Sequence, residues 1–136
     1  MKWQKNLLNL LKERQKKKVA LVVDTSTSPT NMMLTNNIVK LFTEMIPNTI
    51  FVEADFQVRS VTPITDLTTI KYFKHGKSSY TEALEWAEQE NIDSLFYITD
   101  VTGYFYDELT VNYEIFWLVP EDFIPKVPFG KAIRVA

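Results

Sequence analysis

An uninterrupted apolar run near the start of the chain constrains the fold more than any other part of the sequence. Residues 19–23 read Val-Ala-Leu-Val-Val, and three of these five side chains are β-branched. A strand that is covered on both faces has this composition, which is typical of a parallel sheet between layers of helices. Similar runs return at Ser94–Asp100 and Glu114–Val119. The sequence therefore predicts an α/β domain with a mostly parallel central sheet.

Segments with a helical pattern separate these strands. Apolar residues at three-to-four spacing predict helices over residues 3–17 and from about 29 to 46. A third helix is expected to end near Gln89, and the spacing Ser79-x-x-Glu82 predicts a capping box at its start. The first helix is amphipathic with cations at its end, so we expect it to dock on the outside of the domain or to join it to a partner. A membrane-surface or nucleic-acid role is the alternative for this helix.

The remaining elements complete a single domain preceded by one helix. Two short β-rich runs, 49–54 and 57–62, are expected to form a hairpin, and a last short strand is expected at 131–135. We therefore expect an N-terminal amphipathic helix over residues 1–17 and an α/β domain over residues 18–136.

The composition excludes several classes of protein. Cysteine is absent and His75 is the one histidine, which excludes disulfides, zinc-thiolate sites and polyhistidine sites within this chain. The three glycines, at positions 76, 103 and 130, cannot form a GxGxxG motif or a Walker loop. The chain has 15 basic and 17 acidic side chains, a net charge of −2 that favours neither nucleic acid nor an anionic membrane. No apolar run approaches a membrane-spanning length, so we expect a cytoplasmic protein.

Polar side chains follow the first apolar run at alternating positions. Asp24, Ser26 and Ser28 are two residues apart, so in an extended segment they point the same way. Ligands of open α/β sheets bind at the carboxyl ends of the strands, where these residues are expected. Their oxygen atoms suit Mg²⁺ or Mn²⁺ better than zinc or copper. The alternative is a turn in which Ser28, before Pro29, caps the next helix.

Two further segments are expected to bring oxygen ligands to the same edge. Asp100 follows the apolar run that begins at Ser94, and parallel strands deliver their carboxyl ends to one edge. Ser78 lies in the loop before the third helix. The candidate site therefore combines three segments, and its members are Asp24, Ser26, Ser28, Ser78 and Asp100.

Catalytic arrangements fit the sequence less well than binding does. An aspartate-nucleophile phosphatase needs a second carboxylate two residues after the first, and Ser26 occupies that position. A triad of Ser78, His75 and Asp100 would lack a nucleophile elbow. A metal-dependent phosphoester hydrolase is a further alternative, for which His75 alone is available as a base. We therefore expect a binding module rather than an enzyme.

Five segments in this order resemble the von Willebrand factor A domains, over about residues 18–136. The likeness is closest to the bacterial von Willebrand A-like domain at the C-terminus of predicted metallopeptidase-related proteins. The segments are Asp24-Thr25-Ser26-Thr27-Ser28-Pro29, Gly76-Lys77-Ser78-Ser79-Tyr80, Thr99-Asp100-Val101, Ile115-Phe116-Trp117 and Pro128-Phe129-Gly130.

The resemblance implies a Rossmann-like fold and a metal-ion-dependent adhesion site. Such a site holds Mg²⁺ or Mn²⁺ and engages a carboxylate of a partner protein. The association of the family with MoxR-type AAA+ ATPases implies a partner of that class. The ligands that the resemblance implies are Asp24, Ser26, Ser28, Ser78 and Asp100.

The departures from the family pattern leave a second interpretation open. Thr27 and Val101 stand where glycine is expected, and Ser79 stands where aspartate is expected. Lys77, beside the cluster, is a possible charge substitute, because an ammonium group can offset two carboxylates in place of a divalent cation. The alternative is therefore a vestigial site on a purely structural scaffold.

An aromatic segment after Asp100 is a candidate partner surface. Tyr104, Phe105 and Tyr106 are consecutive and are followed by two acidic residues. Aromatic side chains carry much of the binding energy at the centres of interfaces, so we expect these three to bind a partner. In the alternative, the rings cap the end of the sheet.

Overall fold

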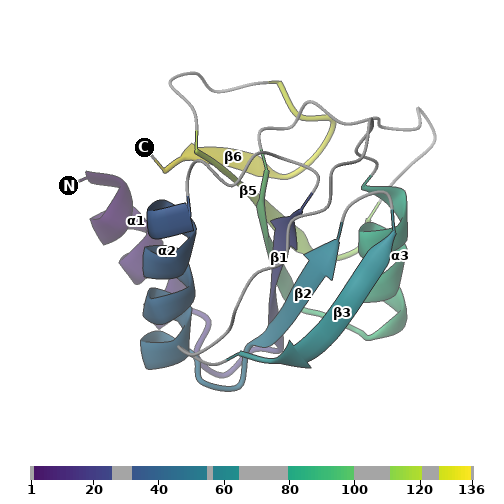
Figure 1. Ribbon diagram of the computed structural model, residues 1–136, viewed down its shortest axis with the longest axis horizontal. Coiled ribbons are helices and arrows are strands. Elements are labelled where there is room, and N and C mark those ends of the chain that lie inside the picture. Colours follow the sequence, from purple (N-terminus) through teal and green to yellow (C-terminus); the bar gives the residue numbers. More distant parts are fainter. Residues whose placement is uncertain are drawn as a thin grey trace.

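The computed structural model of the chain describes residues 2–25, 32–54, 57–64, 80–99, 111–120 and 126–135. Within these ranges one sheet has the strand order β3-β2-β1-β4-β5-β6 (Figure 1). β2 and β3 pair antiparallel, and every other neighbouring pair is parallel. The strands are β1 (Val19–Asp24), β2 (Ile50–Ala54), β3 (Val58–Pro63), β4 (Ser94–Ile98), β5 (Glu114–Val119) and β6 (Lys131–Arg134). The helices are α1 (Lys2–Lys12), α2 (Met32–Met45) and α3 (Thr81–Gln89).

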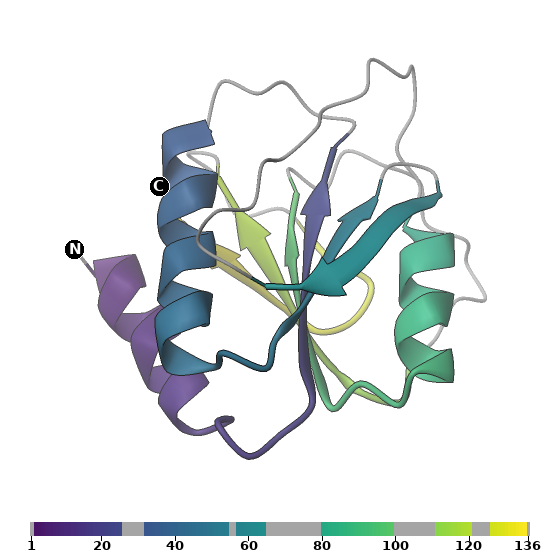
Figure 2. The same ribbon diagram turned by 60° about the horizontal axis from the view of Figure 1, so that its bottom comes forward.

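Helices cover both faces of the sheet, which confirms the α/β prediction. α1 and α2 lie on one face and α3 lies on the other (Figures 1 and 2). All six residues of β1 are buried. Leu21 packs in the apolar cluster beneath α1 and α2, and Val22 packs in the cluster beneath α3. Residues 19–23 are therefore all apolar because neither face of β1 is exposed to water. None of the described helices has the length and apolar character needed to cross a membrane.

The predicted hairpin is present at one edge of the sheet. β2 and β3 pair antiparallel with a register shift between Glu53 and Ala54. Pro63 ends the edge strand, and the N–H of the next residue, Ile64, donates to the Thr49 carbonyl oxygen at 3.0 Å. Proline offers no donor to a further strand, so its position at the edge limits pairing with another chain.

The first helix is shorter than its periodicity predicted. α1 ends at Lys12 rather than at residue 17. Two backbone hydrogen bonds between residues three positions apart follow the helix. The Arg14 N–H donates to the Leu11 carbonyl oxygen and the Lys17 N–H to the Arg14 carbonyl oxygen, each at 3.0 Å. Within this turn the side chain of Arg14 contacts the sheet.

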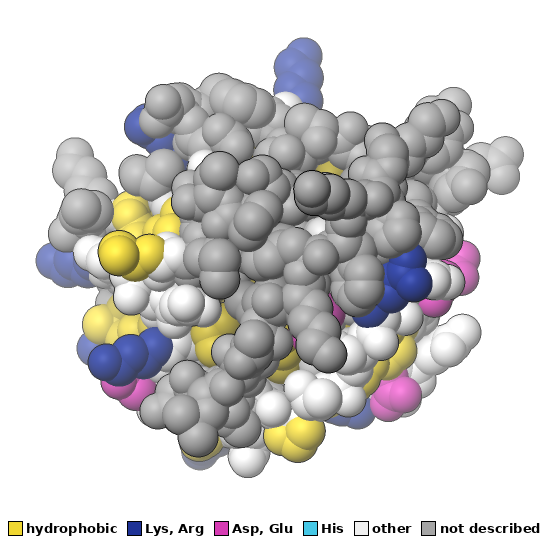
Figure 3. All heavy atoms as spheres, in the orientation of Figure 1, with side chains coloured by type: hydrophobic (Ala, Val, Ile, Leu, Met, Phe, Trp, Pro, Cys, Tyr) yellow, Lys and Arg dark blue, Asp and Glu magenta, His cyan; other side chains and the backbone are white. Residues whose placement is uncertain are grey.

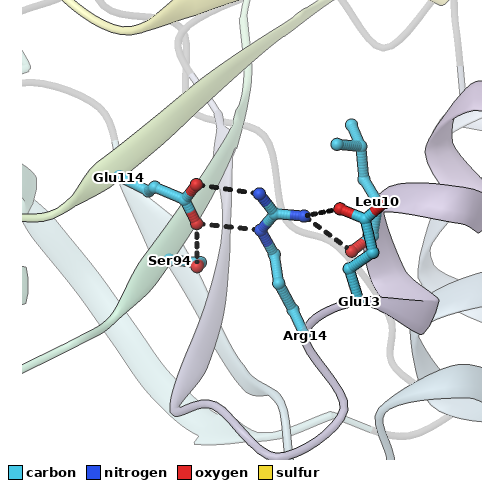
Figure 4. Close-up of polar contacts among 5 residues, drawn as sticks. All are labelled: Leu10, Glu13, Arg14, Ser94 and Glu114. Carbon is cyan, nitrogen blue, oxygen red and sulfur yellow. Dashed lines mark hydrogen bonds and ion pairs between the residues drawn. The ribbon is translucent and has the colours of Figure 1, made fainter.

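Arg14 attaches this turn to the start of β5 (Figure 4). Its Nε and Nη2 atoms donate to the two carboxylate oxygens of Glu114, each at 2.8 Å. Nη1 donates to the Leu10 carbonyl oxygen at 2.9 Å, and the guanidinium carbon lies 4.9 Å from the ring centroid of Phe116. Ser94 Oγ donates to Glu114 Oε1 at 2.6 Å. The bidentate contact of Arg14 and the third donor, Ser94, fix the position of the Glu114 carboxylate in this ion pair.

The predicted capping box at α3 is wrong. Tyr80, not Ser79, occupies the N-cap position, and it makes no side-chain cap hydrogen bond. The Glu82 carboxylate accepts instead from the backbone N–H of Val58 at 3.0 Å. Glu82 therefore satisfies a backbone N–H of β3, and a tertiary contact replaces the local cap.

Gly130 allows the chain to enter β6. Its φ is +74°, which favours glycine. A Cβ atom at this position would lie 2.6 Å from the carbonyl oxygen of Ile115 and would also contact the side chain of that residue. Beside it, Trp117 Nε1 donates to the carbonyl oxygen of Phe129 at 3.1 Å. Two of the five quoted sequence segments therefore pack on each other.

We predict that Gly130→Ala lowers the free energy of unfolding by about 2 kcal/mol or more, because it combines left-handed strain with a backbone clash. Urea denaturation would measure the change, and Lys131→Ala, at the next and exposed position, is the control. Equal stability of Gly130→Ala and the unmodified protein would contradict the prediction.

We predict a loss of stability at acid pH that depends on Glu114. The hydrogen bond from Arg14 lowers the pKa of this carboxyl from 4.5 to about 2. A lowered folded-state pKa contributes stability above pH 4.5 that is lost as the pH falls toward 2. The Glu114 side chain is 42% exposed, so solvent screening keeps the effect modest.

Unfolding free energies at about pH 6 and about pH 3 would test this, with Glu114→Gln beside the unmodified protein. The difference between the two proteins should shrink at the lower pH, whereas Glu85→Gln on an exposed part of α3 should show no such trend. A difference that stays constant with pH would argue against the ion pair.

Candidate functional site

The candidate site lies where β1 and β4 end side by side. These strands are parallel neighbours, and Val23 pairs with Ile98 in their register. Asp24 and Thr99 are the next residues along each strand. Both are 1% exposed. The structure therefore places the first predicted ligand, Asp24, at the carboxyl edge of the sheet, as the sequence indicated.

A chain of hydrogen bonds runs from Asp24 to the start of α3. Thr99 Oγ1 donates to Asp24 Oδ2 at 2.6 Å. The Tyr80 hydroxyl lies 3.1 Å from Thr99 Oγ1. The Thr99 N–H donates to the Leu118 carbonyl oxygen at 3.2 Å, which fixes the backbone of the middle residue. Three separate segments, the ends of β1 and β4 and the start of α3, therefore meet through buried polar groups.

Tyr80 is held in this position by aromatic packing. Its side chain is fully buried. The ring meets Tyr97 of β4 edge-on, with centroids 5.3 Å apart and planes at 86°. It meets Trp117 of β5 at the same centroid distance and at 67°. These are favourable orientations for aromatic pairs, so the hydroxyl of Tyr80 has a defined place.

Thr25 links the end of β1 to β2. Its N–H donates to the Ala54 carbonyl oxygen at 2.8 Å. Its side chain is fully buried, and its hydroxyl has no hydrogen-bond partner among the described residues. Adjacent side chains of an extended strand point to opposite faces, and the burial of Thr25 beside Asp24 is consistent with that alternation.

The structure places one of the predicted ligands, and the other predicted residues lie outside the described ranges. Asp24 is the residue that it places. The predicted residues outside these ranges are Ser26, Ser28, Lys77, Ser78, Asp100, Tyr104, Phe105 and Tyr106. The proposed cluster of five ligands, the charge substitute and the partner segment therefore stay predictions.

Sequence reasoning missed Tyr80 and the hydrogen bond that Thr99 makes to Asp24. The signal for Thr99 was its position directly before Asp100, at the end of a predicted strand. Parallel strands end at the same edge of the sheet, so Thr99 could be expected near Asp24. Tyr80 gave no comparable signal, since it lies at the start of a helix where an aromatic residue is expected to pack in the core.

The donor chemistry at this edge fits a hard cation. The Asp24 carboxylate is an oxygen donor of the kind that Mg²⁺ prefers, and Thr99 donates its hydroxyl proton to it. Within the described ranges no group of three or more His, Cys, Asp or Glu residues is placed to hold a metal ion. On the face drawn in Figure 3 the described acidic and basic side chains are dispersed rather than gathered in one patch. The described side chains on this face therefore form no single charged patch.

A pocket elsewhere in the molecule is unrelated to this edge. It has a volume of about 380 Å³. Its lining includes Ile50, the first residue of β2, whereas Asp24 pairs with Ala54 at the other end of that strand. The full lining is Pro47, Asn48, Thr49, Ile50, Val61, Thr62 and Pro63.

Comparison with known proteins places the sheet within a described family. The model of the family described as VWA-like domain (DUF2201) matches residues 19–136. No curated protein matches the chain. No solved structure matches it either. The matched range begins at the first residue of β1 and contains all six strands of the described sheet, whereas α1 lies ahead of it.

Proposed function

Because this chain belongs to the VWA-like domain family, we propose that it is a protein-interaction module that engages its partner at the carboxyl edge of the sheet. The observation that carries the proposal is the buried carboxylate of Asp24 at that edge, held by Thr99 from the neighbouring strand. A carboxylate that lies at this edge and out of bulk water would interact strongly with a cation bound beside it.

The proposed mechanism is cation-mediated capture of a carboxylate. Mg²⁺ or Mn²⁺ would be held by Asp24 together with the hydroxyls of Ser26, Ser28 and Ser78 and the carboxylate of Asp100. The cation would supply Lewis acidity toward an acidic side chain of the partner. The role of this chain is to hold oxygen ligands at one edge and to keep Asp24 out of bulk water, which strengthens its interaction with a cation.

The proposed partner is a protein, and its class is a MoxR-type AAA+ ATPase. A second contact is proposed at Tyr104, Phe105 and Tyr106, which follow Asp100 in the sequence. Aromatic residues beside a charged anchor would supply apolar contact area around it. Function is then binding rather than catalysis, since the proposed ligands are oxygen donors without an assigned nucleophile or base.

We predict that Asp24→Asn abolishes binding of Mg²⁺ and Mn²⁺, because it removes the charge while keeping the side chain's shape and its ability to accept from Thr99. Titration calorimetry would measure this. The control is Asp93→Asn, whose carboxylate accepts from the Lys18 N–H at 2.8 Å, next to the first residue of β4 and so away from the carboxyl edge.

Two outcomes would refute the cation site. One is an unmodified protein that takes up neither ion at millimolar concentration, alone or with an acidic peptide. The other is an Asp24→Asn variant that binds as tightly as the unmodified protein. The first outcome would favour the alternative in which Lys77 offsets the carboxylates.

We predict that the double change Tyr104→Ser with Tyr106→Ser weakens capture of a MoxR-type ATPase while the melting temperature stays within a few degrees, because interface rings add little to folding. Surface-immobilised binding would measure capture. Val61→Ser, which removes an exposed apolar side chain on β3, is the control. A double variant that unfolds would instead assign the two rings to the core.

A further inference from the structure

We propose that the Tyr80 hydroxyl is a positioning group for the candidate site, which orients the Asp24 carboxylate through Thr99. The juxtaposition that supports this is the buried series of Tyr80, Thr99 and Asp24, with separations of 3.1 and 2.6 Å. The three residues come from the start of α3 and the ends of β4 and β1. The proposal deepens the proposed cation site and rests on it for its effect on metal binding.

The count of protons assigns a direction to the two hydrogen bonds. A threonine hydroxyl has one proton, and Thr99 gives it to the Asp24 carboxylate, which can only accept when ionised. The bond between Tyr80 and Thr99 must then use the proton of Tyr80. The series therefore runs from Tyr80 through Thr99 to Asp24, and each donation strengthens the next by polarisation.

Packing makes Tyr80 a rigid origin for this series. Its ring is held by Tyr97 and Trp117, from two neighbouring strands, at centroid distances of 5.3 Å. Trp117 is in turn tied to the Phe129 carbonyl oxygen at 3.1 Å. This packing keeps the Tyr80 hydroxyl in one position. Through the hydrogen bonds to Thr99 and from Thr99 to Asp24, it thereby orients the Asp24 carboxylate.

The series also joins the three segments that carry the proposed ligands. Asp24 stands two residues before Ser26, and Thr99 stands one residue before Asp100. Tyr80 stands two residues after Ser78. Each described residue of the series therefore stands within two residues of a proposed ligand and is hydrogen-bonded to another member of the series. Groups behind a ligand that fix its orientation affect metal affinity strongly, although they touch no metal themselves.

The test compares two tyrosine variants that lose the same atom. Tyr80→Phe removes the hydroxyl and keeps the ring in the core. Tyr113→Phe is the matched control. The Tyr113 hydroxyl donates to the carbonyl oxygen of Leu84 in α3 at 2.7 Å and takes no part in the series from Tyr80 to Asp24. The readouts are the ¹³C resonance of the Asp24 carboxyl carbon, the affinity for Mn²⁺ and the melting temperature.

We expect Tyr80→Phe to shift the Asp24 carboxyl resonance and to weaken Mn²⁺ binding by about tenfold, as loss of a ligand-orienting group does. Tyr113→Phe should change neither. The melting temperatures of the two variants should be similar, so a loss of affinity confined to Tyr80→Phe would not be a loss of fold. A Thr99→Ser change, which keeps the hydroxyl, should preserve the affinity, and Thr99→Val should reduce it.

The outcomes separate this proposal from the proposed function. If the unmodified protein binds no Mn²⁺, the cation site is refuted, and the Asp24 resonance alone decides whether Tyr80 orients the carboxylate. An unchanged Asp24 resonance in Tyr80→Phe overturns the positioning role. So does an Mn²⁺ affinity of Tyr80→Phe within about twofold of that of a metal-binding unmodified protein.

Discussion

The parallel pairing of β1 with β4 is the constraint on which the candidate site depends. Val23 is paired with Ile98, so the two strands end at the same edge of the sheet and at the same level. A shift by one residue would turn the side chains of β1 to the opposite faces. The apolar clusters on the two faces prevent such a shift, because Leu21 and Val22 would exchange layers. Core packing thereby sets the position of Asp24 beside Thr99.

Burial of polar groups at this edge makes the arrangement specific. Asp24, Thr99 and Tyr80 are each at most 1% exposed. A group left unsatisfied at such depth would cost about 1–3 kcal/mol, and the hydrogen bonds among these side chains offset that cost. The chain belongs to the VWA-like domain family, a type of domain suited to protein interaction. The same three side chains therefore satisfy one another's hydrogen bonds at the edge where the function is proposed.

α1 extends the domain beyond the range that the family model matches. Leu7 and Leu11 are fully buried in the cluster that also contains residues of α2 and of the sheet. The ion pair of Arg14 with Glu114 then fixes the turn after α1 to the start of β5 (Figure 4). The predicted docking of this helix on the domain is thus confirmed, and its contacts make it a covering layer for one face.

The sequence by itself determined the order of elements and the location of Asp24, because both depend on patterns between residues close in the chain. The runs that became β1, β4 and β5 are continuous and apolar, and a strand end is readable where such a run stops. Tertiary structure decided the partners: Glu82 bonds to Val58 instead of capping its helix, and Tyr80 reaches Thr99. These contacts join segments about twenty residues apart, and local periodicity carries no information on which distant polar groups packing brings within hydrogen-bond distance.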